Sequence, residues 1–153
     1  KRNLWLLEVS SNLSGGAYNI PARFNMFATG LEYSPFVCEG DSVKVGGSNV
    51  GLVEGSGAVE MQITTYDDAN GSLKRWFALH HAAATARDGT VGEPGKYAIR
   101  IRVVHSFIEE TSGAYEDIGF FRPENLSVSL SRREDDVSEL QMTFVQLDTF
   151  MRA

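Results

Sequence analysis

The sequence contains little of what a metal-binding or disulfide-stabilised protein needs. Its 153 residues include one cysteine, Cys38, and three histidines, His80, His81 and His105. A single cysteine excludes an internal disulfide framework and fits a reducing compartment, and Cys38 is expected to be a small buried residue rather than a nucleophile. Adjacent histidines on a helix point about 100° apart, and no zinc-ligand spacing is present. We therefore expect no metal site and no cofactor.

Positive charge and long apolar runs are also scarce. There are 14 Lys and Arg against 20 Asp and Glu, which gives a net charge of -6. Proteins that grip a phosphate backbone need clustered Lys and Arg, so specific nucleic-acid binding is not expected. No apolar run approaches the roughly 18 residues of a membrane helix, and the opening one ends at Glu8, too short for a signal peptide.

The motifs of common enzymes are missing as well. Neither Walker nor dinucleotide glycine spacing occurs, and Gly55-Ser56-Gly57 is a flexible trio rather than a nucleophile elbow. Arg132 and Arg133 could bind phosphate, but three acids follow at once, which indicates a solvated hairpin tip. We expect residues 1–153 to form one globular domain without catalytic residues. Because the chain does not begin with Met, a leading segment that was cleaved, is disordered or was left out is expected.

The most informative stretch is residues 59–84, where the hydrophobic period changes once. Val59, Met61, Ile63 and Thr65 alternate with polar residues, as in a half-buried strand. After Tyr66 the apolar spacing becomes three and four, which predicts a helix with a buried stripe. The stripe comprises Leu73, Trp76, Phe77, His80, His81 and Ala84, and its first three members are expected to dock the helix on the core. Side-chain oxygens of Asp67, Asp68 and Asn70 are expected to cap the helix, which explains the two acids without catalysis.

A glycine-rich hairpin is predicted over residues 41–54. Gly46, Gly47 and Asn49 supply the positive-φ positions of a tight turn, and Val43, Val45, Val50 and Leu52 lie on its arms. These arms have too little bulk to bury themselves, so we expect them to project and to pair with another surface. Gly55, Gly57 and Ala58 indicate a flexible hinge at the base.

The remaining pattern is rich in strands. Strands are predicted over residues 4–9, buried on both faces or at an assembly contact, and over residues 24–29. Residues 96–107 form the clearest one, with Tyr97, Ile99, Ile101 and Val103 on one face and Arg100 and Arg102 on the other. A short strand over residues 118–121 is expected to end at Pro123, before a final hairpin. The fold class is therefore mainly β, with seven or eight strands and one inserted α-helix.

In the order of its predicted strands, hairpin arm and helix along the sequence, the chain resembles the tail tube proteins of contractile bacteriophages. That family includes the tube-initiating baseplate proteins and is related to the inner-tube protein of type VI secretion. The resemblance rests on the following parts: Asn3-Leu4 with Glu8-Val9, the strand with Phe24 and Ala28, the arm 43–53, the strand and helix 59–77 with Trp76-Phe77, Gly119 to Pro123, and the last strand 139–150.

The resemblance implies a β-sandwich or barrel that forms a ring through strands shared between subunits. It implies stacked hexameric rings, an outer helix, and an arm that contacts the next ring or a neighbouring subunit through Val43, Val45, Gly46, Gly47, Asn49, Val50 and Leu52. The partners it implies are other copies of the chain, tail or baseplate proteins and the sheath. DNA would pass through an acidic lumen without specific binding, in a virion tail assembled in the host cytoplasm.

Two other classes of function fit parts of the pattern. A type VI inner-tube protein would share the fold. A monomeric β-sandwich that binds carbohydrate would explain the strands and aromatic residues such as Tyr18, Tyr33 and Tyr115, and a hydrolase comes third. The arm favours an assembling protein, because a monomeric module has no use for a long hairpin that cannot bury itself.

Overall fold

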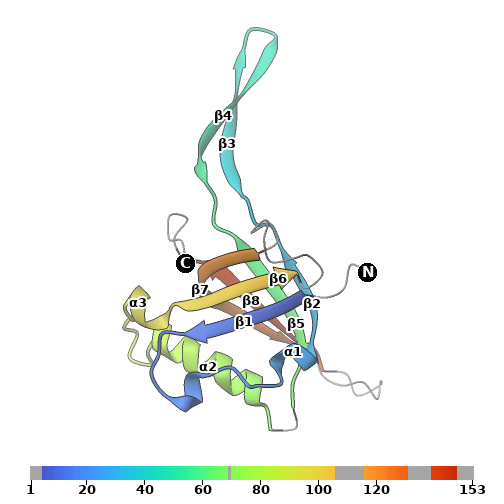
Figure 1. The fold of residues 1–153 in the computed structure, drawn as a ribbon. Coiled ribbons are helices and arrows are strands. Elements are labelled where there is room, and N and C mark those ends of the chain that lie inside the picture. Colours follow the sequence, from blue (N-terminus) through green and yellow to red (C-terminus); the bar gives the residue numbers. More distant parts are fainter. Residues whose placement is uncertain (1–4, 69, 106–115, 131–138, 148–153) are drawn as a thin grey trace.

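Two separate sheets make up the β structure of this computed structural model, which describes residues 5–68, 70–105, 116–130 and 139–147 (Figure 1). The large sheet is antiparallel and has the strand order β1-β6-β7-β8-β5-β2. Its strands are β1 (Trp5–Ser11), β2 (Ala28–Tyr33), β5 (Glu60–Tyr66), β6 (Ile99–His105), β7 (Glu116–Val128) and β8 (Glu139–Gln146). The second sheet consists of β3 (Cys38–Val45) and β4 (Ser48–Ser56).

One helix of several turns accompanies these strands. It is α2 (Ser72–Ala84), inserted between β5 and β6, whereas α1 (Phe24–Phe27) and α3 (Pro94–Tyr97) are single turns and η1 (Gly16–Tyr18) is a 3-10 turn. The prediction of a mainly β chain with one inserted helix is confirmed. Among the described residues, no helix combines the length and the apolar character needed to cross a bilayer.

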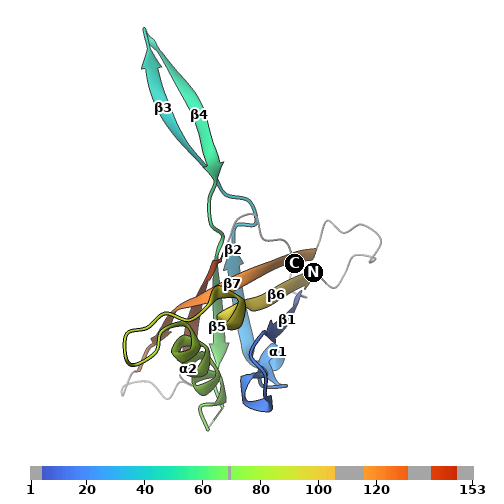
Figure 2. The ribbon, with the colours of Figure 1, turned by 90° about the vertical axis from the view of Figure 1, so that its left-hand side faces the viewer.

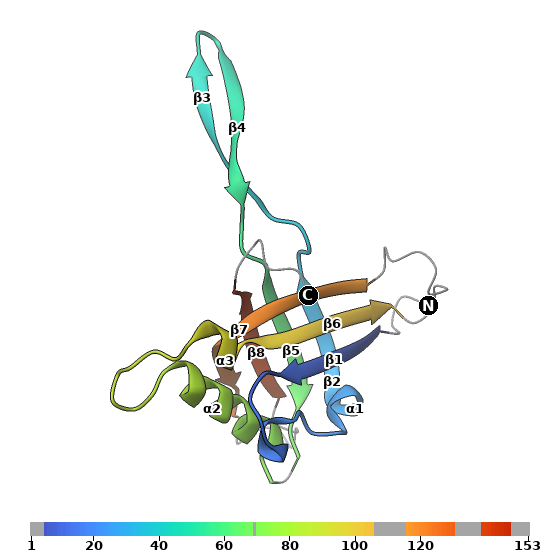
Figure 3. The ribbon, with the colours of Figure 1, turned by 60° about the vertical axis from the view of Figure 1, so that its left-hand side comes forward.

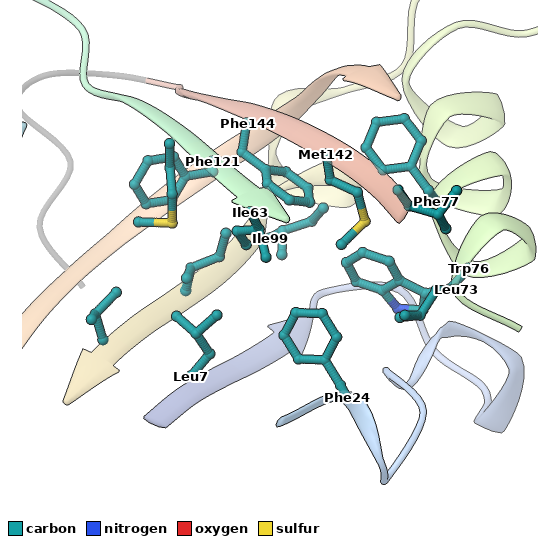
Figure 4. Packing of buried hydrophobic residues seen from close by; sticks show 14 of the residues in the cluster. Leu7, Phe24, Ile63, Leu73, Trp76, Phe77, Ile99, Phe121, Met142 and Phe144 are labelled. Atoms are coloured by element: carbon teal, nitrogen blue, oxygen red, sulfur yellow. The ribbon is translucent and has the colours of Figure 1, made fainter. Parts of the chain in front are cut away.

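The large sheet curls into a half-barrel, so that β1, β6 and β7 run across β2, β5 and β8 (Figure 3). Its inner face holds the hydrophobic core, which α2 covers from one side (Figure 4). The buried cluster comprises Leu7, Phe24, Val59, Met61, Ile63, Leu73, Trp76, Phe77, Ile99, Ile101, Val103, Phe121, Leu140, Met142 and Phe144. The predicted sandwich or barrel fold is thus confirmed.

The predicted core helix is docked as expected. Leu73, Trp76 and Phe77 are each at most 5% exposed. The rings of Trp76 and Phe77 lie 6.3 and 5.8 Å from the ring of Phe144 on β8 (Figure 4). His80 is also buried, but His81 is exposed, so its place in the predicted stripe is wrong. It lies one residue round the helix from His80, on the side that faces solvent.

The two acids before α2 cap it, as predicted. Asp68 Oδ1 accepts the N–H of Ser72 at 2.9 Å, and Asp67 Oδ1 accepts the N–H of Leu73 at 3.1 Å. These carboxylates satisfy free donors of the first turn, while the residue that directly precedes the helix is Gly71 in the left-handed conformation. Asn70 was predicted to cap the helix with its side-chain oxygen. Instead, its backbone N–H donates to Asp68 Oδ1 at 3.1 Å.

Residues 24–27 do not form the predicted strand. They make the helical turn α1, closed by N–H groups of Met26 and Phe27 that donate to the carbonyl of Arg23. A strand would place Phe24 and Met26 on one face. The turn instead buries Phe24 and leaves Met26 80% exposed.

Pro123 does not end a strand either. β7 continues through it to Val128, because the pairing with β8 shifts register between Pro123 and Asn125. A bulge is a position where a missing N–H does little harm. The predicted burial of Ile99, Ile101 and Val103 on one face of β6 is confirmed, although Tyr97 belongs to α3. The predicted tip with Arg132 and Arg133 lies outside the described residues.

β1 is buried on one face only. Leu7 is 2% exposed, whereas its neighbour Leu6 on the other face is 41% exposed. The prediction that this strand is buried on both faces is therefore wrong for the single chain. The alternative, that it lies at an assembly contact, stays a prediction.

Candidate functional site

The hairpin β3–β4 projects from the body of the molecule as a two-stranded arm (Figures 1 and 2). Val45 pairs with Ser48 across a two-residue turn of Gly46 and Gly47, and Gly46 has a φ of 64°. Glycine adopts this left-handed conformation without steric cost, which is why the turn can be so tight. The predicted hairpin is confirmed and is longer than residues 41–54.

The arm has one apolar face, defined here as Val43, Val45, Val50 and Leu52. Val43 is paired with Val50, and Asp41 with Leu52, and cross-strand partners point to the same side of a two-stranded sheet. The four side chains are between 43% and 63% exposed. On the other face Lys44 is paired with Asn49, so Asn49 does not join the four apolar residues of the predicted interface.

Every residue of both arm strands is exposed. A two-stranded hairpin is at best marginally stable in water, and a row of uncovered aliphatic side chains is unfavourable for a free surface. No described residue of this chain covers the apolar arm face. The apolar arm face is therefore the candidate contact surface of the described residues.

The base of the arm is held more firmly than the predicted flexible hinge. Gly57 is buried, and its N–H donates to the carbonyl of Val37 at 2.8 Å. We call the segments around Val37 and Gly57 the neck of the arm. A Cβ at Gly57 would lie only 2.5 Å from Val37 Cγ1, so a larger residue at position 57 would force the neck to shift. This neck fixes the direction in which the arm leaves the body.

Cys38 begins β3 and is exposed, so the prediction that it is buried is wrong. The reason is its position on an arm that has no core of its own. Among the described residues, no three His, Cys, Asp or Glu gather in a way that could hold a metal ion.

Both ring nitrogens of His80 have structural partners. Nδ1 donates to the carbonyl of Trp76 at 2.9 Å, because a carbonyl can only accept. In the neutral ring Nε2 then accepts a hydrogen bond from the hydroxyl of Ser11, with 2.7 Å between Nε2 and Oγ. Burial lowers the pKa of the imidazole, because it disfavours the charged form, and the bond to Trp76 opposes this shift. His80 is therefore a neutral core residue.

The outer face of the large sheet, opposite the core, carries charged side chains beside apolar ones such as Leu6, Ile118 and Phe120. Arg102 on β6 donates from Nη1 to Glu8 on β1 at 2.9 Å, and from Nε to Glu116 on β7. These bonds raise the pKa of Arg102, and the bond from Arg102 lowers the pKa of Glu116. By strand alternation, this face of the described strands carries Glu8, Glu32, Glu60, Glu116, Glu139, Arg100, Arg102 and Arg122.

The comparisons with known proteins give a likeness of fold. No protein-family model matches the sequence, and no curated protein matches it. Among solved structures, the chain is similar to one from the tail of an empty GTA particle, refined helically with C6 symmetry. The likeness has a TM-score of 0.50 and 12% identity, and it covers 80% of this chain and 79% of the other. The two chains share a fold.

Proposed function

We propose that this chain is a non-enzymatic structural subunit of a phage-like tail, which forms six-membered rings that stack through the arm. The observation that carries the proposal is the projecting hairpin with an apolar face that no described residue covers. The chain of similar fold belongs to a tail structure with C6 symmetry, which supports both the tail and the number of subunits in a ring.

The large sheet offers the means to close such a ring. In the described part of the chain β1 and β2 each pair with one strand only, so the edge of β2, and the part of the β1 edge that Asn25 does not occupy, are open to neighbouring copies. If strands of successive subunits line a central channel, the outer sheet face lies in its wall. That face carries five glutamates and three arginines in the described strands, an excess of acid that suits the passage of DNA without adhesion.

The proposed location is the virion tail, after assembly in the host cytoplasm. The proposed partners are further copies of this chain, other tail or baseplate proteins, and the sheath of a contractile tail. Within this proposal the chain is either the repeating tube subunit or the ring that initiates the tube.

Electron microscopy of the purified protein at high concentration, paired with its solution mass, tests the proposal. We expect rings or hollow tubes: long tubes indicate the repeating subunit, and isolated rings indicate the initiator. Deletion of residues 46–51 is expected to abolish stacking while the body keeps its fold by circular dichroism. As a matched pair, Val43→Ser with Val50→Ser should weaken stacking, whereas Ser42→Ala with Asn49→Ala, on the other face, should not.

A strict monomer of 16.8 kDa at all concentrations would contradict the proposal and favour a monomeric binding module. The described aromatic candidates offer little support for that alternative. The hydroxyl of Tyr33 donates to Asp117, and the ring of Tyr18 packs edge-on against the ring of His80 at 6.0 Å, so both side chains are engaged within the body. Tyr115 lies outside the described residues.

A further inference from the structure

A pocket of about 290 Å³ is lined by residues around α1 and the start of α2, which lie at the end of the body away from the arm (Figure 1). Its apolar lining includes Ala22, Phe24 and Phe27 around α1, together with Leu73 from the first turn of α2. No pattern in the sequence indicates this pocket, because residues 21–27 and 67–73 are brought together only by the curl of the sheet.

The topology of two strands fixes the opposite placement of pocket and arm. β2 begins beside the pocket, directly after α1, and runs toward the arm; β5 starts below the arm and ends at the pocket (Figure 1). Since β5 has seven residues, the two features are separated by roughly 20 Å of strand. The arm of a given chain therefore points away from its own pocket.

We infer that the pocket beside α1 and α2 receives the apolar arm face of a second copy of this chain, so that successive subunits join head to tail. This inference rests on the proposed function and adds the receiving surface to it. A contact between two different patches gives a ring where the rotation between subunits closes and an open filament where it does not, and patches at opposite ends of the molecule favour the filament. Each copy then offers one arm and one pocket.

The chemistry of the two surfaces is complementary. The pocket is lined by apolar side chains, and the arm presents four that are uncovered. The rim carries Asp67 and Asp68 against a single cation, Arg23. On the arm, Asp41 is paired with Leu52 and lies on the apolar side, whereas Lys44 lies on the opposite face. The contact is therefore stabilised by the burial of apolar area, and Arg23 is the cation of the pocket that Asp41 could meet.

Crosslinking tests the inference in assembled protein. In a Cys38→Ser background, Val50→Cys is combined with Ala22→Cys, and a flexible bismaleimide is added to rings or tubes. We expect a ladder of linked chains on a denaturing gel. The matched control combines Val50→Cys with Ala82→Cys, an exposed position of α2 about 15 Å farther along the helix, and is expected to give no ladder.

Filling the pocket gives a second readout. Ala22→Trp should reduce tube length at least tenfold, while Ala82→Trp, a Trp on an exposed face, should leave it unchanged. Thermal melting shows whether each variant is folded. Normal tubes from folded Ala22→Trp, a ladder only with Ala82→Cys, or only arm-to-arm dimers of the single Val50→Cys variant would overturn the inference and leave the proposed function standing. Absence of rings and tubes from the unmodified chain would overturn both.

Discussion

The side-chain amide of Asn25 bonds both backbone groups of Leu7 at the free edge of β1. Asn25 Oδ1 accepts the Leu7 N–H at 3.0 Å, and Nδ2 donates to the Leu7 carbonyl at 3.0 Å. Leu7 is paired with Val103 on its other side, so Asn25 replaces one residue of a missing strand. Because α1 leads directly into β2, the bonds tie together the two ends of the sheet. The edge of β2 is then the more available one for pairing with a neighbour.

Asn25→Ala is expected to destabilise the monomer by about 1 to 2 kcal/mol, since two hydrogen bonds are lost at a partly buried edge. Asn25→Asp keeps the acceptor for the Leu7 N–H but loses the donor for its carbonyl, so an intermediate or larger loss is expected. Urea unfolding measures both. Thr29→Ala, which removes a bond from an exposed hydroxyl to Thr64, is the control and should cost less. An Asn25→Ala variant as stable as the unmodified chain would mean that the edge is not closed in this way.

Stability should depend on pH through His80. Its folded pKa is lowered below the ordinary 6.5 by burial, so below that pH the unfolded chain binds more protons than the folded chain. The contribution of His80 is complete above about pH 6.5 and is lost as the pH falls toward the folded pKa. Melting temperatures at pH 7.5 and pH 5.5 should therefore differ, with the lower value at pH 5.5.

His80→Gln, which cannot take up this proton, should reduce that difference. Its neighbour His81 is exposed, and His81→Gln serves as the control that leaves the difference unchanged. Equal pH dependence in His80→Gln and the unmodified protein would assign the effect to other groups.

The direction of the arm should depend on Gly57. In Gly57→Ala the new Cβ would meet Val37 Cγ1 at 2.5 Å, and such overpacking costs about 1 to 3 kcal/mol or moves the neck. Loss of stacking is the expected result by electron microscopy. Gly55→Ala, where a Cβ meets nothing within 4 Å, should assemble normally. The double variant Gly57→Ala with Val37→Ala should recover part of the stacking, and a lack of any recovery would argue against this contact as the cause.

The sequence predicts those parts of the fold in which local pattern and tertiary environment agree. β5 and α2 follow periods of two and three to four because one face of each meets the core, and Met61, Ile63, Leu73 and Trp76 are all buried. The arm is predictable for a different reason, namely its turn residues. Its isolation also follows from composition, since small side chains cannot build a core.

The errors arise where tertiary contacts override local pattern. Phe24 and Met26 alternate as in a strand, but the helical turn that positions Asn25 against β1 separates them. Pro123 would ordinarily end a strand, but β7 continues through it because Pro123 lies at a bulge. Cys38 was expected to follow the usual burial of its residue type, yet it lies on the arm. The pocket beside α1 joins segments at least forty positions apart, which no periodicity in one sequence can reveal.

Trp76 should be the most sensitive position of α2. It is 2% exposed, its Nε1 donates to the carbonyl of Tyr18 at 2.9 Å, and its ring lies 4.5 Å from that of His80. Trp76→Ala leaves a large cavity and is expected to cost about 3 to 5 kcal/mol in urea unfolding. Trp76→Phe keeps most of the ring volume and loses the hydrogen bond, so a smaller loss is expected.

Leu79→Ala is the matched control on the same helix, because Leu79 is 37% exposed and its truncation leaves no enclosed cavity. Stacking adds a second criterion, since the start of α2 borders the pocket. If Trp76→Ala lowers stability but the folded fraction still assembles, the helix acts through the core alone. If assembly is lost while the body remains folded, α2 also holds the pocket in shape. A Trp76→Ala variant no less stable than Leu79→Ala would show that α2 is not docked on the sheet as described.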